Sequence, residues 1–154
     1  MKTKKAFTMV ELIFVIVIIG ILAAVAIPRL AATRDDAKVS MLAKATQTVQ
    51  SEIIAQIVST NKVPQTTADM EELSNTVNEL KDFVIVNNKV IQLIDTDNNL
   101  QVCKVITIDD SNVSSVRLVL TDGVGTSAIC IGLQKLIPNS NNTGVTIAGN
   151  IVNY

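Results

Sequence analysis

The sequence predicts an α+β fold, in which a long N-terminal α-helix precedes a small head built on an antiparallel β-sheet. Near the N-terminus, 16 consecutive apolar residues run from Leu12 to Ile27, counting Gly20. No Gly or Pro occurs between Arg29 and Asn61, so one helix can continue through this stretch. From Phe83 onward, short runs rich in Val, Ile and Thr alternate with turn signals. We therefore predict four segments along the chain: a short basic stretch at 1–6, an apolar helix at 7–30, its amphipathic continuation at 31–60, and a globular head at 61–154.

The composition points away from enzymes and from binding of nucleic acids. The 154 residues include 13 basic and 14 acidic ones, which gives a formal net charge of -1. This balance argues against a protein that binds nucleic acid directly through bulk charge. The chain has no histidine, the commonest general base and a frequent metal ligand. We expect a structural protein with no cofactor and no metal site.

The first 27 residues have the layout of a membrane segment with a basic stub. Residues 1–6 contain three lysines and no acid, and a basic stub of this kind stays on the cytoplasmic side. A helix from Phe7 to Ile27 would be about 31 Å long and would match a hydrocarbon core of about 30 Å. Three interpretations fit: a secretory signal peptide cut near Ala24–Ala26, an uncleaved membrane anchor, or a segment processed at its cytoplasmic end.

Glu11 is the informative residue of this segment, because a carboxylate in a membrane helix usually marks function. The simpler interpretation is a boundary residue at the cytoplasmic edge of the anchor. The functional interpretation requires a cation nearby. Cleavage after Ala6 would create one, the free amine of Phe7, about one helical turn from Glu11.

The stretch KKAFTMVELIFVIVIIGILAAVAIP resembles the processing and methylation segment of type IV pilins and of type II secretion pseudopilins. The resemblance covers about residues 1 to 30. It implies cleavage between Ala6 and Phe7, so that residues 1–6 would be a cleaved leader. It also implies N-methylation of Phe7 and a role for Glu11 in assembly, where it would pair with the amine of a neighbouring subunit. Ala6 departs from the glycine that is usual in the family, but it is also small.

The resemblance also implies a location and a set of partners. The precursor would cross the bacterial inner membrane once, with its head in the periplasm, and would then enter a periplasmic or cell-surface filament. The expected partners are other pilin subunits, a prepilin peptidase, and an inner-membrane assembly platform with a cytoplasmic ATPase. The chain has no phosphate-binding loop of its own. Two alternatives remain: a pseudopilin of a type II secretion or DNA-uptake system, and a single-pass membrane protein with a periplasmic binding head that never polymerises.

Gly20 and Pro28 interrupt the helical propensity of the first segment. Pro28 cannot donate to the Ala24 carbonyl, so we expect a kink or local unwinding near residues 24 to 28. The alternative is a tolerated proline at the outer edge of the anchor. Beyond it, apolar positions recur every three or four residues and predict one buried helical face, formed by Val39, Leu42, Thr46, Val49, Ile53 and Ile57. Arg34 and Lys38 are expected to face solvent.

The head is expected to begin with a short helix capped by Thr67 or Asp69 and then to turn to β-structure. The face of that helix would carry Met70, Leu73, Val77 and Leu80. Six runs are predicted as strands: 83–86, 89–95, 100–108, 116–121, 128–133 and 144–152. The turn signals between them include 95–99 and 109–112.

Cys103 and Cys130 are predicted to form a disulfide if the head lies in an oxidising compartment. Closing this loop would stabilise the head by about 3 kcal/mol. In similar pilins a cysteine pair often joins the C-terminal region. The alternative is two buried free thiols in adjacent strands.

The turn from Asp95 to Asn99 begins like a calcium-binding loop. It lacks the glycine of the sixth position, where Leu100 stands, and the glutamate of the twelfth, where Ile106 stands. We therefore favour an ordinary hairpin turn and keep calcium binding as a minor alternative.

Overall fold

The computed structural model describes residues 7–112, 115–140 and 144–149. The chain divides into two compact units, one that ends at Asp35 and one that begins at Asp36. The first unit carries the apolar segment, which we call the anchor (Phe7–Leu30), and the second is the head. The predicted leader, residues 1–6, lies outside the described residues.

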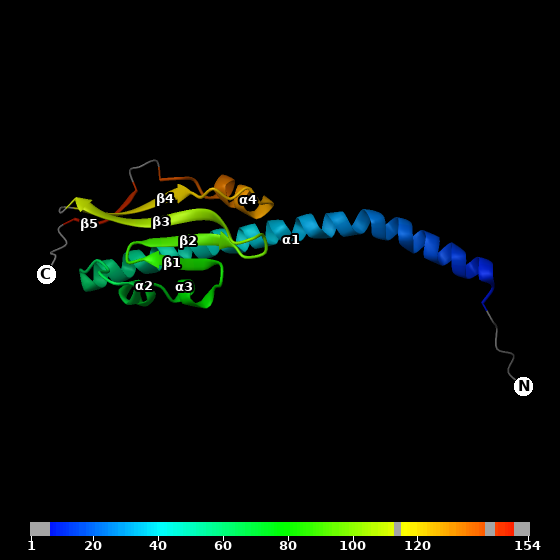
Figure 1. The fold of residues 1–154 in the computed structure, drawn as a ribbon, viewed down its shortest axis with the longest axis horizontal. Helices are drawn as coiled ribbons and strands as arrows, with labels where there is room; N and C mark the ends of the chain where they lie inside the picture. Colours follow the sequence, from blue (N-terminus) through cyan, green and yellow to red (C-terminus); the bar gives the residue numbers. More distant parts are fainter. Residues whose placement is uncertain (1–6, 113–114, 141–143, 150–154) are drawn as a thin grey trace, which may run out of the picture. The chain divides into compact units, whose positions relative to one another are not determined.

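The first helix, α1 (Met9–Thr60), is continuous for 52 residues (Figure 1). It begins with a capping box, in which Thr8 and Glu11 satisfy each other's backbone N–H groups. The helix passes through Pro28, and residues 24 to 28 are all helical. The single chain therefore shows no local unwinding there, and a change of this region on assembly stays a prediction.

From Leu42 onward α1 presents one apolar face to the head. Its buried residues are Leu42, Ala43, Thr46, Val49, Ile53 and Ile57. This confirms the predicted face, with Val39 partly buried beside it. The Thr46 hydroxyl donates to the Leu42 carbonyl at 2.8 Å, so its burial leaves no polar group unpaired. The helix ends at Thr60, and Asn61 follows with a φ of 52°, a backbone conformation that often terminates helices.

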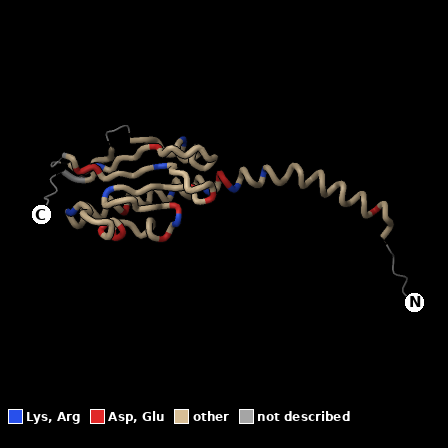
Figure 2. Tube along the Cα trace, in the orientation of Figure 1, with Lys and Arg blue, Asp and Glu red and all other residues tan. Residues whose placement is uncertain are grey.

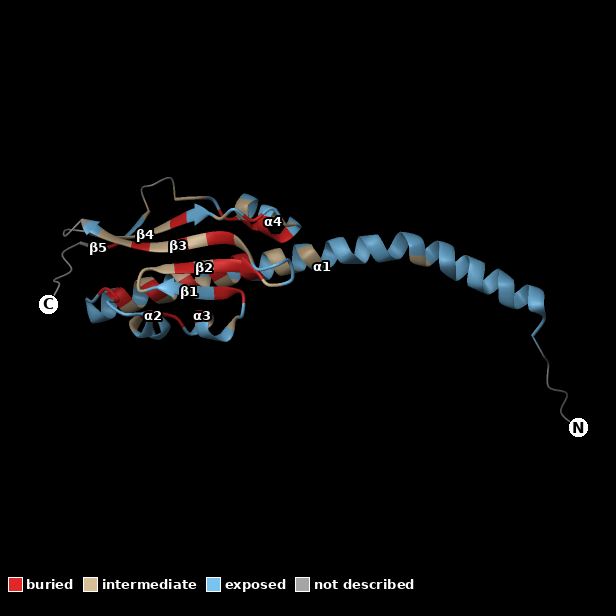
Figure 3. Ribbon diagram, in the orientation of Figure 1, coloured by how far each residue is buried: buried red, intermediate tan, exposed pale blue. Residues whose placement is uncertain are grey.

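The strands of the head form one antiparallel sheet in the order β1-β2-β3-β4-β5. They are β1 (Phe83–Asn87), β2 (Val90–Asp95), β3 (Gln101–Asn112), β4 (Ser115–Asp122) and β5 (Val145–Gly149). Side chains of the sheet, such as Ile91, Ile106 and Leu118, share one hydrophobic core with α1. Figure 3 shows this buried layer along the strands. The predicted α+β class is confirmed.

Two short helices, α2 (Thr67–Leu73) and α3 (Asn75–Glu79), stand where one was expected. Thr66, and not Thr67 or Asp69, is the N-cap of α2, and Asp69 completes the capping box as its N3 residue. Ser74 separates the helices because it is extended at the end of α2 and caps α3 through a bond from the Val77 N–H.

The predicted strand at 128–133 is wrong, because this stretch belongs to helix α4 (Ala128–Leu136). Ser127 caps the helix by accepting from the Cys130 N–H at 3.2 Å. Ile129, Cys130 and Leu133 are buried together, a spacing that suits a helix better than a strand. Ile129 and Ile131 favoured a strand by composition and by their spacing of two, but in the structure Ile129 is buried and Ile131 is exposed.

The long hairpin of β3 and β4 also differs from expectation. Residues 109–112, predicted as a turn, belong to β3, and the pairing shifts register between Asp109 and Asn112. The polar residues 109–112 form the end of a strand that contains a bulge. Because such residues are also typical of turns, the sequence alone did not separate the two structures. The last predicted run is a strand up to Gly149, and its residues 150–152 lie outside the described residues.

Candidate functional site

Glu11 and Thr8 define the start of the anchor. The Glu11 Oε2 atom accepts from the Thr8 N–H at 2.9 Å and from the Thr8 hydroxyl at 2.8 Å. The Thr8 hydroxyl in turn accepts from the Glu11 N–H at 3.3 Å. Both bonds to the carboxylate go to one oxygen, and Oε1 accepts no bond within the described part of the chain. Glu11 thus completes the capping box through Oε2, and its Oε1 atom can accept a bond from another partner.

The anchor exposes almost all of its apolar surface. Every residue from Phe7 to Leu30 is exposed except Ala23, which is half-buried (Figure 3). Large aliphatic and aromatic side chains take part, among them Phe14 and Leu22. In the described part of the chain, α1 is the one helix that is long and apolar enough to cross a membrane. Such a surface needs lipid or protein around it, because an apolar patch of this size is not stable in water.

The other predicted site residues of the first unit are placed as follows. Phe7 is exposed just before α1, whereas Ala6, on the other side of the predicted cleavage point, lies outside the described residues. Gly20 and Pro28 both lie within α1. A Cβ atom on Gly20 would meet no atom within 4 Å, so nothing within the chain requires a glycine there.

A cluster of charges joins α1 to the sheet at the beginning of the head. The Lys38 Nζ atom lies 2.7 Å from Asp97 Oδ2, 3.5 Å from Asp82 Oδ1 and 3.7 Å from Asp95 Oδ1. Lys38 was expected in a solvated face, but its ammonium lies among three carboxylates. The turn that resembled a calcium loop thus has a lysine from another element as its cation. The sequence shows that the turn at 95–99 is acidic, but it does not show which basic residue pairs with it.

Asp95 is the most buried member of the cluster, with no exposed side-chain surface. Burial opposes its ionisation, but hydrogen bonds from Ser127, Asn98 and the Asp97 N–H, together with the charge of Lys38, outweigh it. The pKa of Asp95 therefore lies below its ordinary value. Because Ser127 also caps α4, this carboxylate links α1, the β2–β3 turn and the start of α4.

The predicted disulfide is present between Cys103 and Cys130. Cys103 lies at a bulge, since its neighbours Val102 and Lys104 pair with Ile94 and Leu93 and leave it without a partner in the register. Cys130 belongs to α4, so the bond joins a strand to a helix, and the alternative of two thiols in adjacent strands is wrong. Gly132 lets α4 approach α1, because a Cβ atom there would lie 2.8 Å from Val39 Cγ2.

Two further polar side chains, Lys104 and Glu52, join segments of the head that are distant in sequence. Neither was predicted from the sequence. The fully buried Lys104 bonds to Asp122 at 2.5 Å and to Asn139 at 2.9 Å, which ties the segment after α4 to the sheet. Glu52 of α1 accepts from the hydroxyl groups of Ser74, at 2.5 Å, and Thr76, at 3.1 Å. Burial opposes the ionisation of Glu52, but these bonds prevail and lower its pKa.

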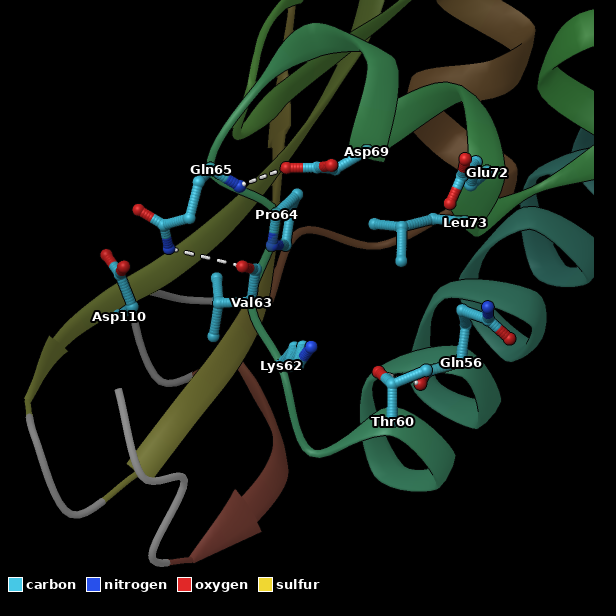
Figure 4. Close-up of a pocket in the computed structure, with 10 residues that line it drawn as sticks. All are labelled: Gln56, Thr60, Lys62, Val63, Pro64, Gln65, Asp69, Glu72, Leu73 and Asp110. Carbon is cyan, nitrogen blue, oxygen red and sulfur yellow. Dashed lines mark hydrogen bonds between the residues drawn. The ribbon is translucent and has the colours of Figure 1, made fainter. Parts of the chain in front are cut away.

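One groove of the head has a volume of about 600 Å³ and lies where α1 leads into α2 (Figure 4). Its lining combines polar side chains with apolar ones such as Val63 and Leu73. Two of its charged groups serve the local structure: Asp69 accepts from the N–H of Gln65 at 2.8 Å, and Asp110 pairs with Lys89 at 2.7 Å. Lys62 and Glu72 complete the charged lining. The hydrogen bonds of this groove stabilise the chain connection and form no arrangement of acid, base and nucleophile among the residues that Figure 4 shows.

Comparisons with known proteins bear on the first unit. A family model described as the prokaryotic N-terminal methylation motif matches residues 1–27. No curated protein and no solved structure gives a match to the chain. The matched residues include Ala6, Phe7 and Glu11 and most of the exposed apolar surface of α1. Residues 1–27 of this chain therefore match a prepilin-type cleavage and methylation segment, which supports a type IV pilin-like or pseudopilin precursor.

Proposed function

We propose that the protein is a structural subunit of a type IV pilus-like filament and has no catalytic role. A prepilin peptidase would cut between Ala6 and Phe7 and methylate the new amine. The anchor would hold the subunit in the inner membrane, with the head in the periplasm, until an assembly platform and its ATPase transfer it to the filament. The observation that carries the proposal is the methylation motif on a helix whose apolar surface is exposed from Phe7 to Leu30.

The exposed anchor supports the assembly step energetically. In a bilayer this surface contacts lipid, and in a filament it would contact the same surface of other copies. Helices in both settings are held by van der Waals packing between apolar side chains. The transfer from membrane to filament then involves little change in apolar exposure, so an external motor could drive it in either direction.

Glu11 would set the register of each new subunit. A carboxylate without a cation in an apolar bundle costs several kcal/mol, so a copy whose Glu11 misses the Phe7 amine of its neighbour is disfavoured. The capping geometry is compatible with this role, because Oε2 accepts both Thr8 bonds while Oε1 has no partner among the described residues. Capping within a subunit and pairing between subunits need not compete.

The N-terminus of the protein made by its own cells gives the first test. Mass spectrometry should find N-methylated Phe7 as the first residue. An intact Met1 would support the non-polymerising membrane protein, and a chain that starts at Ile27 would support a secreted domain. Filaments sheared from the cells and probed for this subunit test polymerisation. A pseudopilin of a secretion or DNA-uptake system would also have methylated Phe7 but would yield few surface filaments.

Three variants separate the two roles of Glu11. Glu11→Gln keeps an acceptor for the capping box but removes the charge, Thr8→Val removes the hydroxyl of the box but keeps the charge, and Glu11→Ala removes both. We expect Glu11→Gln to reduce the filament fraction nearly as much as Glu11→Ala, by about 100-fold if the lost pairing is near 3 kcal/mol. Thr8→Val should have a small effect. Normal filaments from Glu11→Gln would contradict the pairing.

A further inference from the structure

The head carries excess charge of opposite sign at the two edges of its sheet. The first surface, which we call the acidic flank, consists of Glu71, Glu72 and Glu79 on α2 and α3, all exposed. These helices contact β1, an edge strand. From Thr67 to Glu79 the chain has four acidic residues and no basic one. With Lys62 and Lys81 on either side included, acidic residues still predominate.

The second surface, which we call the basic flank, lies at the β4 and β5 side of the sheet. Its centre is a groove of about 460 Å³ between α1 and the segment that follows α4. Lys44 lines the groove, Lys135 is exposed in the last turn of α4, and Leu136 and Val145 are more than half exposed, at 57% and 54%. The sequence has no acidic residue from Ser40 to Gln50 or from Ala128 to Gly149. Figure 1 shows α2 and α3 beside β1, and α4 on the other side of the sheet. Figure 2 shows where the charged residues lie along the chain in the same orientation.

These charges are not used within the head. The carboxylates of the acidic flank and the ammonium groups of Lys44 and Lys135 make no ion pair or side-chain hydrogen bond in the part of the chain that the structure describes. Lys38, Lys89 and Lys104, in contrast, are each paired with aspartates. The charges of the two flanks are therefore available to another molecule.

Both flanks are also held rigidly. Glu52 fixes α3 to α1 through Ser74 and Thr76. The disulfide fixes α4 to β3, and Lys104 fixes the segment after α4 through Asn139. Rigid surfaces lose little conformational entropy when they bind, which favours specific docking.

We propose that the partner of each flank is the other flank of a second copy of this chain. The acidic α2–α3 surface of one head would pack on the groove and lysines of the next, with Leu136 and Val145 covered at the centre. Such an interface joins two different surfaces, and a contact of this kind that does not close on itself builds an open helical array. Because the flanks lie at opposite edges of the sheet, one head can use both at once. This inference rests on the proposed filament and specifies how its heads contact each other.

Cross-linking of full-length subunits in their own cells tests the contact. The double variant Lys44→Cys/Glu79→Cys, treated with a flexible bismaleimide, should give a ladder of linked subunits in sheared filaments. The native cysteines are bonded to each other and do not react. Each single variant is the matched control and should give no dimer, because the interface joins unlike surfaces. Dimers from a single variant, or filaments of the double variant without a ladder, would overturn the inference.

Charge reversal gives a second, functional measurement. Lys44→Glu/Lys135→Glu should lower the filament fraction about tenfold, because like charges then face each other. Adding Glu72→Lys/Glu79→Lys to the same chain should restore most of it, whereas Lys44→Arg/Lys135→Arg should have no effect. Thermal unfolding of each variant checks that the head still folds. If reversal has no effect while the parent forms filaments, the flank contact fails and the filament proposal stands. If the parent forms no filaments, both fail.

Discussion

The two parts of α1 have similar aliphatic side chains in opposite environments. In the anchor, Ile19 is 58% exposed, whereas in the head Ile53 is fully buried in the core. The second part is stabilised by its own sheet, disulfide and ion pairs. The first part finds no apolar partner within the described residues, so its side chains contribute little to the folding of a single chain. One helix therefore combines a self-sufficient core with a surface that depends on lipid or on other subunits.

The same truncation on both parts should show this difference most strongly. Ile53→Ala should lower the free energy of unfolding of the head by about 4 kcal/mol, because it leaves a cavity in a packed core. Ile19→Ala should leave the unfolding of the head unchanged. Chemical denaturation of the full chain in detergent, followed by circular dichroism, measures both. A comparable loss from Ile19→Ala would mean that the anchor and the head do not fold separately.

The disulfide should contribute the next largest effect. Cys103→Ala/Cys130→Ala should lower the free energy of unfolding by about 3 kcal/mol, since the bond constrains the unfolded chain between residues 27 positions apart. Insertion of the anchor into membranes should not change. A thiol assay on denatured, unreduced protein first checks the bond, and two free thiols there would contradict it.

The Lys38 cluster should matter less than the disulfide but more than a surface charge. Lys38→Met removes the cation of the buried Asp95 and should cost about 2 kcal/mol of head stability. Lys44→Met is the matched control on the same helix, because Lys44 is exposed and unpaired among the described residues, and it should change stability by less than about 0.5 kcal/mol. Equal melting curves for the two variants would show that the cluster does not stabilise the head.

A decrease in pH from neutrality should have the smallest effect on the stability of the head, because the carboxylates become protonated only at acidic pH. The pKa values of Asp95 and Glu52 are lower in the folded head than their ordinary values. Their contribution is therefore complete above the unfolded pKa, about 4, and is lost as the pH falls through the folded pKa. By this argument, the midpoint temperature of thermal unfolding of the head should not change between about pH 5 and 7 and should decrease below about pH 4. Asp95→Asn should reduce the decrease in midpoint temperature at low pH. If the variant shows the same decrease as the parent protein, groups other than Asp95 cause it.

Much of the fold could be predicted because the relevant signals are local. Apolar residues every three or four positions located the buried face of α1, and runs of Val and Ile located all five strands of the sheet. Asn61 and Pro64 located the end of the long helix near Thr60. The α4 helix was mistaken for a strand because its isoleucines have strand propensity. Its cap, Ser127, is local, but the disulfide that stabilises it joins it to a residue 27 positions away in the sequence.

The site was predictable to a similar extent. The processing segment is contiguous, so the order of Ala6, Phe7 and Glu11 before an apolar run was sufficient to identify it, and the match to residues 1–27 agrees. The capping role of Glu11 could also have been found, since Thr8 and Glu11 have the spacing of a capping box. The partners of Lys38 and Lys104 could not, because each lies on another element.

The sequence by itself determined that the chain has a prepilin-type N-terminus, a long helix and an antiparallel head, because these depend on residues close together along the chain. Only the tertiary structure decided which charges are paired. Lys38 is 59 residues from Asp97, and Lys104 is 35 residues from Asn139, so folding alone brings them together. The same packing leaves Glu79 and Lys44 without partners within the described chain, at opposite edges of one sheet. An ion pair depends on distance in space, and distance in space is what a sequence does not display.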